Sequence, residues 1–163
     1  MDRTISFRFE TINPGWAREI ATWQYDLPHK MYSFKPEDFD ENLNHLLNPD
    51  YDYYSAFDEQ GKLVGYSCFG EDARVAGGDY EADALDVGLG LRPELTGQGL
   101  GTHFLLSILD FAREQYSPAA FRTTFAEFNQ RSRRVCEKVG FRELVGFVCP
   151  HKQTNFVVHM RKG

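Results

Sequence analysis

Glycine is concentrated in one segment of the chain, between an alternating apolar run and a helical one, at Gly88, Gly90, Gly97, Gly99 and Gly101. Glycine loses more backbone entropy on folding than any other residue, so this density needs a reason. Glycines at positions 97, 99 and 101 allow a tight loop with outward-facing N–H groups, and the positive end of the next helix lies beside it. The segment therefore predicts a phosphate site. The alternative is that these glycines only turn the chain and let the helix pack closely.

Two familiar phosphate-binding motifs do not fit this segment. A P-loop needs a lysine directly after its last glycine, and Thr102 stands there instead. A dinucleotide fold needs Gly-x-Gly-x-x-Gly after the first strand of a βαβ unit. The run from Gly97 to Gly101 has another spacing and follows an apparent antiparallel meander.

Composition narrows the function classes. Eighteen Lys and Arg residues against 24 Asp and Glu give a net charge of −6, so we expect no nucleic-acid partner. No run of 18 apolar residues is present, so we expect no membrane span. The three cysteines are odd in number and form no Cys-x-x-Cys pair, so we expect neither disulfides nor a metal site. With no apolar signal region at the N-terminus, these features indicate a cytoplasmic protein.

The periodicity of the chain predicts one mixed α/β domain over residues 1–163, in the order β-α-α-β-β-β-α-β-α-β-β. Strands are expected where apolar residues alternate, and helices where they recur every three to four residues. The expected strands are 5–12, 53–57, 63–69, 84–91, 121–128, 143–149 and 155–160. The expected helices begin near Pro14 and Pro36 and cover about 100–115 and 132–139. Residues 70–82 are polar and glycine-containing and are expected to form a mobile loop.

Two motifs resemble the GNAT superfamily of acetyl-CoA-dependent N-acyltransferases. The first is TGQGLG at 96–101, which is similar to the family's Arg/Gln-x-x-Gly-x-Gly/Ala except that Thr96 stands at the first position. The second is NQRSRRVCEKVGF at 129–141, in which Asn129, Glu137, Lys138, Gly140 and Phe141 match the family pattern in register. The element order is also similar along almost the whole chain.

The resemblance implies a central, mostly antiparallel twisted sheet flanked by helices. It also implies a V-shaped opening between the fourth and fifth strands that holds the pantetheine arm of acetyl-CoA. Gly88 and Gly90 would leave room beside that arm, and the Arg131, Arg133, Arg134 and Lys138 cluster would offer one cation to the 3′-phosphate. The cofactor-binding residues implied are Leu89, Gly90, Leu91, Gly97, Gln98, Gly99, Leu100, Gly101, Thr102 and Asn129. Asn129 has an alternative role as a helix cap.

The implied reaction moves an acetyl group to a primary amine of a small molecule or peptide. The nucleophile must be neutral, and a carboxylate can remove its proton. Asp86, on the same side of the fourth strand as Gly88 and Gly90, is the first candidate base, and Glu127 is the second. The alternative for each is an ordinary structural or surface carboxylate. The tetrahedral oxygen would be held by a main-chain N–H, that of Leu91.

The leaving thiolate needs a proton, and Cys136 stands where many relatives place a tyrosine. A thiol can act as that acid, or Cys136 can simply pack in the core. Tyr25 and Tyr32 lie in a segment, WQYDLPHKMY, that is similar to the part of some relatives that meets the substrate cleft, and they are the expected acceptor-site residues.

The sequence leaves the amine, and whether the protein is a monomer or a homodimer, undetermined. Acceptor specificity is expected to lie in residues 24–36, 70–82 and 149–155. The alternative function is a CoA-binding sensor or partner-binding module without efficient turnover, and a nucleotide-dependent phosphate enzyme is a third, weaker hypothesis.

Overall fold

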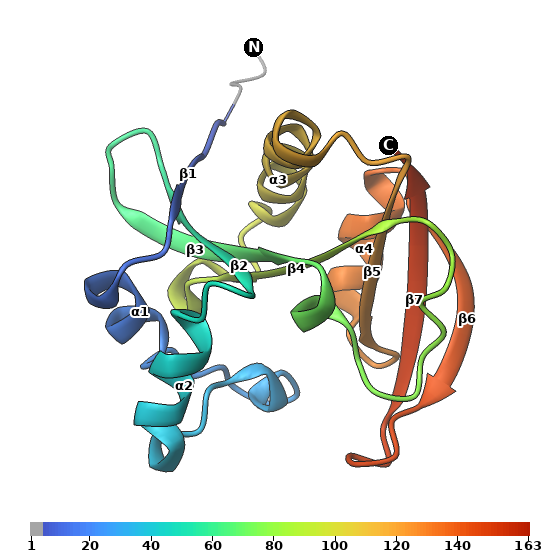
Figure 1. The fold of residues 1–163 in the computed structure, drawn as a ribbon, viewed down its shortest axis with the longest axis horizontal. Coiled ribbons are helices and arrows are strands. Elements are labelled where there is room, and N and C mark those ends of the chain that lie inside the picture. The colour runs from blue at the N-terminus through green and yellow to red at the C-terminus, as the bar shows by residue number, and fades with distance from the viewer. Residues whose placement is uncertain (1–4) are drawn as a thin grey trace.

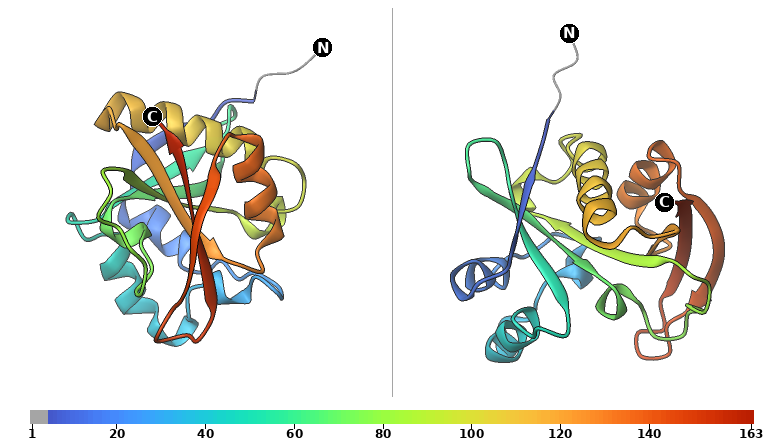
Figure 2. Two further views of the ribbon diagram at one scale, coloured as in Figure 1. Left: turned by 90° about the vertical axis from the view of Figure 1, so that its right-hand side faces the viewer. Right: turned by 45° about the horizontal axis from the view of Figure 1, so that its top comes forward.

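A seven-stranded sheet with the strand order β1-β2-β3-β4-β5-β7-β6 forms the centre of the molecule. This computed structural model describes residues 5–163. Helices α1 and α2 lie on one face of the sheet, and α3 and α4 lie on the other (Figures 1 and 2). The strands are β1 (Arg8–Thr11), β2 (Asp52–Phe57), β3 (Leu63–Phe69), β4 (Leu85–Leu91), β5 (Ala120–Ala126), β6 (Arg142–Val148) and β7 (Asn155–Lys162). The helices are α1 (Pro14–Ile20), α2 (Phe39–Leu46), α3 (Gly101–Tyr116) and α4 (Gln130–Lys138).

The expected element order and sheet class are confirmed. All neighbouring strands pair antiparallel except β4 and β5, which run parallel. Short 3₁₀ turns join the main elements: η1 (Lys30–Tyr32), η2 (Pro36–Asp38), η3 (Glu71–Ala73) and η4 (Pro93–Leu95). The first strand begins at Arg8 rather than at residue 5, because residues 5–7 have no ladder partner.

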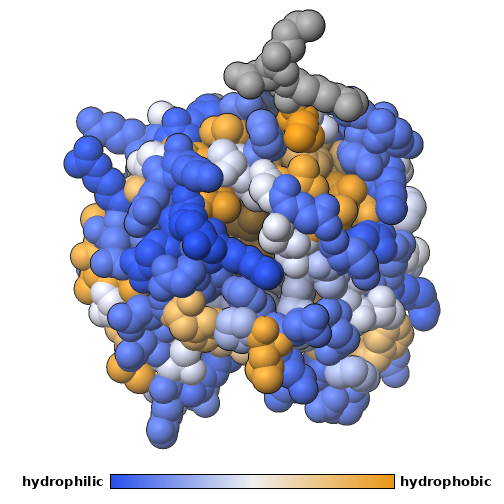
Figure 3. Space-filling model, turned by 180° about the vertical axis from the view of Figure 1, so that it is seen from behind, coloured by the Kyte–Doolittle hydropathy of each residue, from blue (hydrophilic) through white to orange (hydrophobic). Residues whose placement is uncertain are grey.

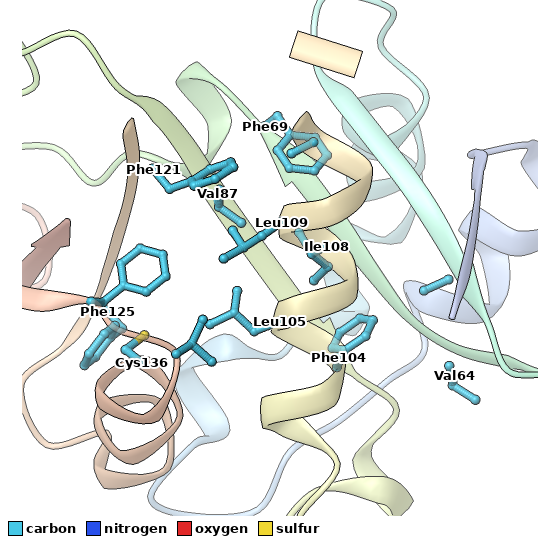
Figure 4. Packing of buried hydrophobic residues seen from close by; sticks show 14 of the residues in the cluster. Val64, Phe69, Val87, Phe104, Leu105, Ile108, Leu109, Phe121, Phe125 and Cys136 are labelled. Carbon is cyan, nitrogen blue, oxygen red and sulfur yellow. The ribbon is translucent and has the colours of Figure 1, made fainter. Parts of the chain in front are cut away.

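Apolar side chains fill both faces of the sheet, which explains why β2 and β3 are buried along most of their length. On one face, α3 packs Phe104, Leu105, Ile108 and Leu109 against the sheet (Figure 4). On the other face, the cluster under α1 and α2 includes Ala17, Ile20, Trp23, Leu43, Leu46, Tyr53, Phe57 and Leu63. Burial on this scale holds the sheet firmly on both sides, since each large apolar side chain contributes about 1.5–3 kcal/mol.

The sheet opens between β4 and β5. These two parallel strands pair only through Leu85 with Phe121 and Asp86 with Arg122, and then separate. The last connection is a hydrogen bond from Thr123 Oγ1 to the carbonyl of Val87, 3.0 Å long. Beyond this point the cleft side of β4 has no strand beside it, which confirms the expected V-shaped opening.

A buried ion pair lies at the point where the two strands part. Arg122 Nε donates to Asp86 Oδ1 at 2.6 Å, and Arg122 Nη2 donates to Asp86 Oδ2 at 2.8 Å. Both side chains are almost fully buried. Arg122 also donates to the carbonyl of Ala82, so the pair joins β4, β5 and the segment before β4.

Residues 70–82 were expected to form a mobile loop, and the structure instead ties them down. Arg74 Nε donates to Asp86 Oδ2 at 2.8 Å. The hydroxyl of Tyr80 accepts from the Val75 amide at 2.9 Å and lies 3.1 Å from Thr124 Oγ1 on β5. The guanidinium of Arg122 stacks 5.0 Å from the Tyr80 ring centre. Thr124 and Arg122 lie more than 40 residues from Tyr80, so local composition could not reveal these contacts.

We expect Asp86→Ala to lower the free energy of unfolding by about 3–5 kcal/mol, because it leaves the buried Arg122 charge without its partner. Urea unfolding followed by circular dichroism measures this change. Arg74→Gln is the matched control: Arg74 contacts the same carboxylate but is 41% exposed, so its loss should cost about 1 kcal/mol or less. Equal effects of the two substitutions would contradict the conclusion that the buried Asp86–Arg122 pair stabilises the point where β4 and β5 part.

Candidate active site

A cavity of about 570 Å³ occupies the opening between β4 and β5. It extends from the glycine loop before α3, along β4, to η3 and β2, and α4 forms part of its wall. From behind, the molecule shows a hollowed surface with apolar residues at depth and hydrophilic residues around the rim (Figure 3). The two ends of the cavity differ in chemistry.

One end presents a run of free main-chain N–H groups. Within the described part of the chain, no hydrogen bond has an N–H of residues 97–103 as its donor, and the first closing bond of α3 is Phe104 N–H to the Leu100 carbonyl. The helix has no side-chain cap at its N-terminus. Orphan N–H groups at a helix start, together with the helix dipole, form an anion site.

Glycine is required at the three loop positions for different structural reasons. Gly97 and Gly99 adopt φ of 74° and 80°, which few other residues tolerate. Gly101 lets α3 approach α4, because a Cβ there would lie 2.9 Å from Val135 Cγ2. Gly97, Gly99, Gly101 and Thr102 line the cavity, as expected. Gln98 and Leu100 do not line the cavity, and the side-chain amide of Gln98 donates to the Glu94 carbonyl. Only the main-chain groups of these two residues are therefore available to a ligand in the cavity.

Cations from α4 line the cavity, and one of them lies beside the glycine loop. Arg131, Arg134 and Lys138 line the cavity with exposed side chains. The Arg131 guanidinium lies beside Gly97, with Nη2 3.4 Å from the position a Cβ would take there. Arg133, from the same basic cluster, lies outside the cavity and pairs with Glu143 at 2.9 Å. Three cations of α4 thus line the cavity of a chain whose net charge is −6.

Strand β4 offers its peptide groups to the cavity at alternate positions. The carbonyls of Val87 and Leu91 accept from side chains on the cavity side, while Asp86 and Arg92 bond toward β3. Leu89 shares the parity of Val87 and Leu91, so its N–H and C=O also face the cavity. An amide-containing arm laid here can pair with it as an added strand.

Gly88 and Gly90 make room for protein side chains rather than for a ligand, contrary to the expectation from the sequence. A Cβ at Gly88 would lie 2.7 Å from Cys68 Sγ, and a Cβ at Gly90 would lie 2.4 Å from the Tyr66 ring. Gly90 still borders the cavity, but its peptide groups belong to the ladder with Tyr66. The signal in the sequence was the absence of side chains, and it could not show what fills the space.

Asn129 caps α4 and lines the cavity at the same time. Its side-chain oxygen accepts from the Ser132 amide at 3.1 Å, as the capping interpretation predicts. Burial raises the pKa of the Tyr32 phenol, and the nearby Asn129 side chain lowers it in part. The Tyr32 hydroxyl accepts from the Ala126 amide, so Tyr32 joins η1 to the end of β5. Tyr25, the other expected acceptor-site residue, donates from its hydroxyl to the Leu91 carbonyl.

The structure does not favour either candidate base. Asp86 is 1% exposed, and both of its oxygens accept from arginine, so it does not line the cavity and its role is structural. Glu127 follows β5 with an exposed side chain outside the cavity. Strand parity pointed to Asp86, but the partner that neutralises it lies 36 residues away.

Cys136 borders the cavity and also belongs to the main core, beside Phe125 (Figure 4). Burial raises the pKa of its thiol to about 12. The thiol therefore stays protonated at neutral pH, but it gives up that proton reluctantly. Packing is the role that the geometry favours.

The opposite end of the cavity contains residues that sequence reasoning missed. Tyr53, Tyr66, Cys68 and Asp72 line it, and the Asp72 carboxylate accepts a hydrogen bond from the Tyr53 hydroxyl. Asp72 lies in η3, within the segment that polarity alone marked as a loop. No local pattern distinguishes it from its acidic neighbours. In the described range 5–163, no three His, Cys, Asp or Glu side chains gather into a metal-binding group.

The sequence itself places this fold and site in a family. The model of the acetyltransferase (GNAT) family matches residues 17–141, and the chain therefore belongs to that family. No curated protein is a significant match. None of the helices in residues 5–163 is long and apolar enough to cross a membrane.

Solved structures share the fold at low sequence identity. An acetyltransferase of the GNAT family from Bacillus anthracis has a TM-score of 0.73 and 16% identity, covering 98% of this chain and 96% of that one. An aminoglycoside acetyltransferase in complex with coenzyme A has a TM-score of 0.75 and 15% identity over 96% and 95%. A mutant spermidine N-acetyltransferase from Vibrio cholerae has a TM-score of 0.71 and 16% identity over 96% and 94%.

The two cavity thiols should resist alkylation in the folded protein. Burial raises the pKa of Cys68, like that of Cys136, to about 12. A raised pKa lowers the thiolate fraction at any given pH, and at pH 8 the fraction falls on the order of 10³-fold relative to a thiol near 8.5. We expect iodoacetamide to label these positions at least about a hundredfold more slowly in native than in urea-denatured protein, as measured by peptide mass spectrometry. Equal rates would show that the thiols are not buried in solution.

Proposed function

We propose that this protein transfers an acetyl group from acetyl-CoA to a primary amine of a small molecule or peptide. The single observation that carries the proposal is the run of unpaired N–H groups at residues 97–103 beside Arg131. A diphosphate fits this end, because it needs several donors and positive charge together. The coenzyme A in the aminoglycoside acetyltransferase structure supports the same ligand class.

The cavity suits the rest of such a cosubstrate. The pantetheine amides would pair with Leu89 on β4, and the thioester would then lie farther along the strand, towards Gly88 and η3. The neutral amine attacks the thioester carbon, the C–S bond breaks, and the thiolate takes up a proton. A cavity-facing main-chain N–H at the Gly88 end of β4 would stabilise the tetrahedral oxygen, whereas Leu91, the donor expected from the sequence, lies at the loop end of the strand.

The amine itself is proposed only as a class. Similar solved structures include a spermidine N-acetyltransferase and an acetyltransferase in complex with ribostamycin, and both spermidine and ribostamycin are amines. Three buried free cysteines support a cytoplasmic setting, since reducing conditions keep thiols unpaired.

A second candidate function is CoA binding without efficient turnover. It is favoured by Cys136, a reluctant acid at the position where a phenol was expected, and by the structural engagement of Asp86. Acetylation of any amine in a panel of polyamines, aminoglycosides and peptides would exclude it. CoA binding with no turnover on the whole panel would favour it.

Saturating CoA, at 100 times its Kd, should stabilise the protein by about 2.7 kcal/mol, or roughly 5–10 °C in Tm for a chain of this size. Differential scanning fluorimetry measures the shift. Arg131→Gln should weaken CoA binding about tenfold, because it removes a cation beside the diphosphate loop.

The control is Arg133→Gln on the same helix, since Arg133 pairs with Glu143 outside the cavity. Its CoA-induced shift should match that of the wild type. If millimolar acetyl-CoA produces no shift in the wild type, the proposed function is wrong.

A further inference from the structure

One carboxylate lines the cavity among the residues that the structure describes, and it belongs to Asp72. Its side chain is 17% exposed and lies on η3. The other charged residues that line the cavity are basic: Arg74, Arg131, Arg134, Lys138 and Lys152. A positively charged group would be attracted to the single carboxylate, because the basic side chains repel it from the rest of the cavity.

The contacts of Asp72 leave one oxygen open. The Tyr53 hydroxyl donates to Oδ2, and His45 Nε2 lies 2.8 Å from the same oxygen. Within residues 5–163, no hydrogen bond reaches Oδ1. The carboxylate is thus held in place by two side chains on one side and is free to accept on the other.

Aromatic rings complete the surroundings of this carboxylate. Tyr53 and Tyr66 line the same end, with ring centres 6.2 Å apart, and Tyr25 lines the cavity nearby. Burial raises the pKa of Tyr53 and of Tyr66, and the charge of Asp72 adds to both shifts, so these groups remain phenols. A carboxylate in a cavity that aromatic rings also line is an environment that favours an ammonium group.

Asp72 also lies next to the middle of β4. Its neighbour Ala73 packs against Gly88, with Ala73 Cα 3.7 Å from the position a Cβ would take there. Gly88 precedes Leu89, whose peptide group faces the cavity. Asp72 therefore lies beside the part of β4 where the acetyl group would be delivered in the proposed function.

We propose that Asp72 binds the ammonium group of the acceptor through Oδ1 and takes its proton, and that His45 is a positioning residue that holds Asp72. This inference rests on the proposed function. The ammonium loses one proton to the Asp72 carboxylate, and the neutral nitrogen then attacks the thioester carbon. The C–S bond breaks, and a second proton from nitrogen converts the thiolate to the thiol. Asp72 releases its proton to solvent, so the net products are the amide, CoA and one proton.

The binding half of the proposal can be tested without turnover. Butylammonium is titrated into CoA-saturated protein at pH 7 by calorimetry, with butan-1-ol as the uncharged control. The wild type should bind the cation in preference to the alcohol, and Asp72→Asn should weaken that binding at least tenfold. Glu71→Gln is the matched control: Glu71 is an exposed neighbour on the same turn outside the cavity, so its removal should change nothing.

The proton-transfer half is tested by pH profiles on the best amine of a panel containing spermidine, ribostamycin and a lysine peptide. Asp72→Asn should lower kcat/KM about a hundredfold at pH 7. Part of this loss should return by pH 9, because more of the amine is then neutral in solution. His45→Phe, which keeps a ring against Tyr51 but loses the bond to Asp72, should raise KM for the amine several-fold and leave the CoA-induced Tm shift unchanged.

The groups that face Asp72 are His45 from α2, Tyr53 from β2, and Cys68 and Tyr66 from β3, with Arg74 following it in the chain. The His45→Phe variant is measured over the same pH range. Binding of butylammonium by Asp72→Asn as tightly as by the wild type, or no preference for the cation in the wild type, would overturn the inference while the CoA-induced shift survives. Loss of that shift in the wild type would instead overturn the proposed function.

Discussion

The buried pair between Asp86 and Arg122 is the constraint on which the site depends. Two parallel strands that paired along their whole length would leave no cavity, and two that never met would leave no fixed geometry. The pair joins β4 to β5 at one point, and the strands then part. Neither charge reaches solvent, so the attraction is strong and the penalty for losing one partner is large. The stable junction at this point therefore allows β4 and β5 to separate into an open cleft.

The cleft separates two kinds of recognition along β4. At the α3 end, a diphosphate would meet main-chain N–H groups and the cations of α4. At the η3 end, a single carboxylate lies among tyrosines. The overall charge of −6 describes neither end, because five Lys and Arg side chains but only one Asp or Glu line the cavity within the described residues. A cofactor polyanion and an amine cation can thus bind in one cavity without competing.

Much of the fold could be predicted from the sequence, because its signals are local. The apolar period of α3, Pro14 at the start of α1 and the glycines before α3 each act within a few residues. The acidic residues could not be interpreted in this way. Asp86 has its partner at Arg122, and Asp72 has its partners at His45 and Tyr53, none of them close in sequence. The glycines of β4 misled for the same reason, since Tyr66 and Cys68 fill their space from another strand.

The contrast between the two aspartates shows what decides whether a carboxylate can act on a ligand. Asp86 has three arginine N–H donors divided over both oxygens and is sealed from solvent. Asp72 has its two partners on one oxygen, the other oxygen accepts no hydrogen bond within residues 5–163, and the residue lines the cavity. Each charge is stabilised, but only Asp72 keeps an unused lone pair where a ligand can reach it. In this fold a carboxylate's availability follows from the distribution of its donors, which only the tertiary structure determines.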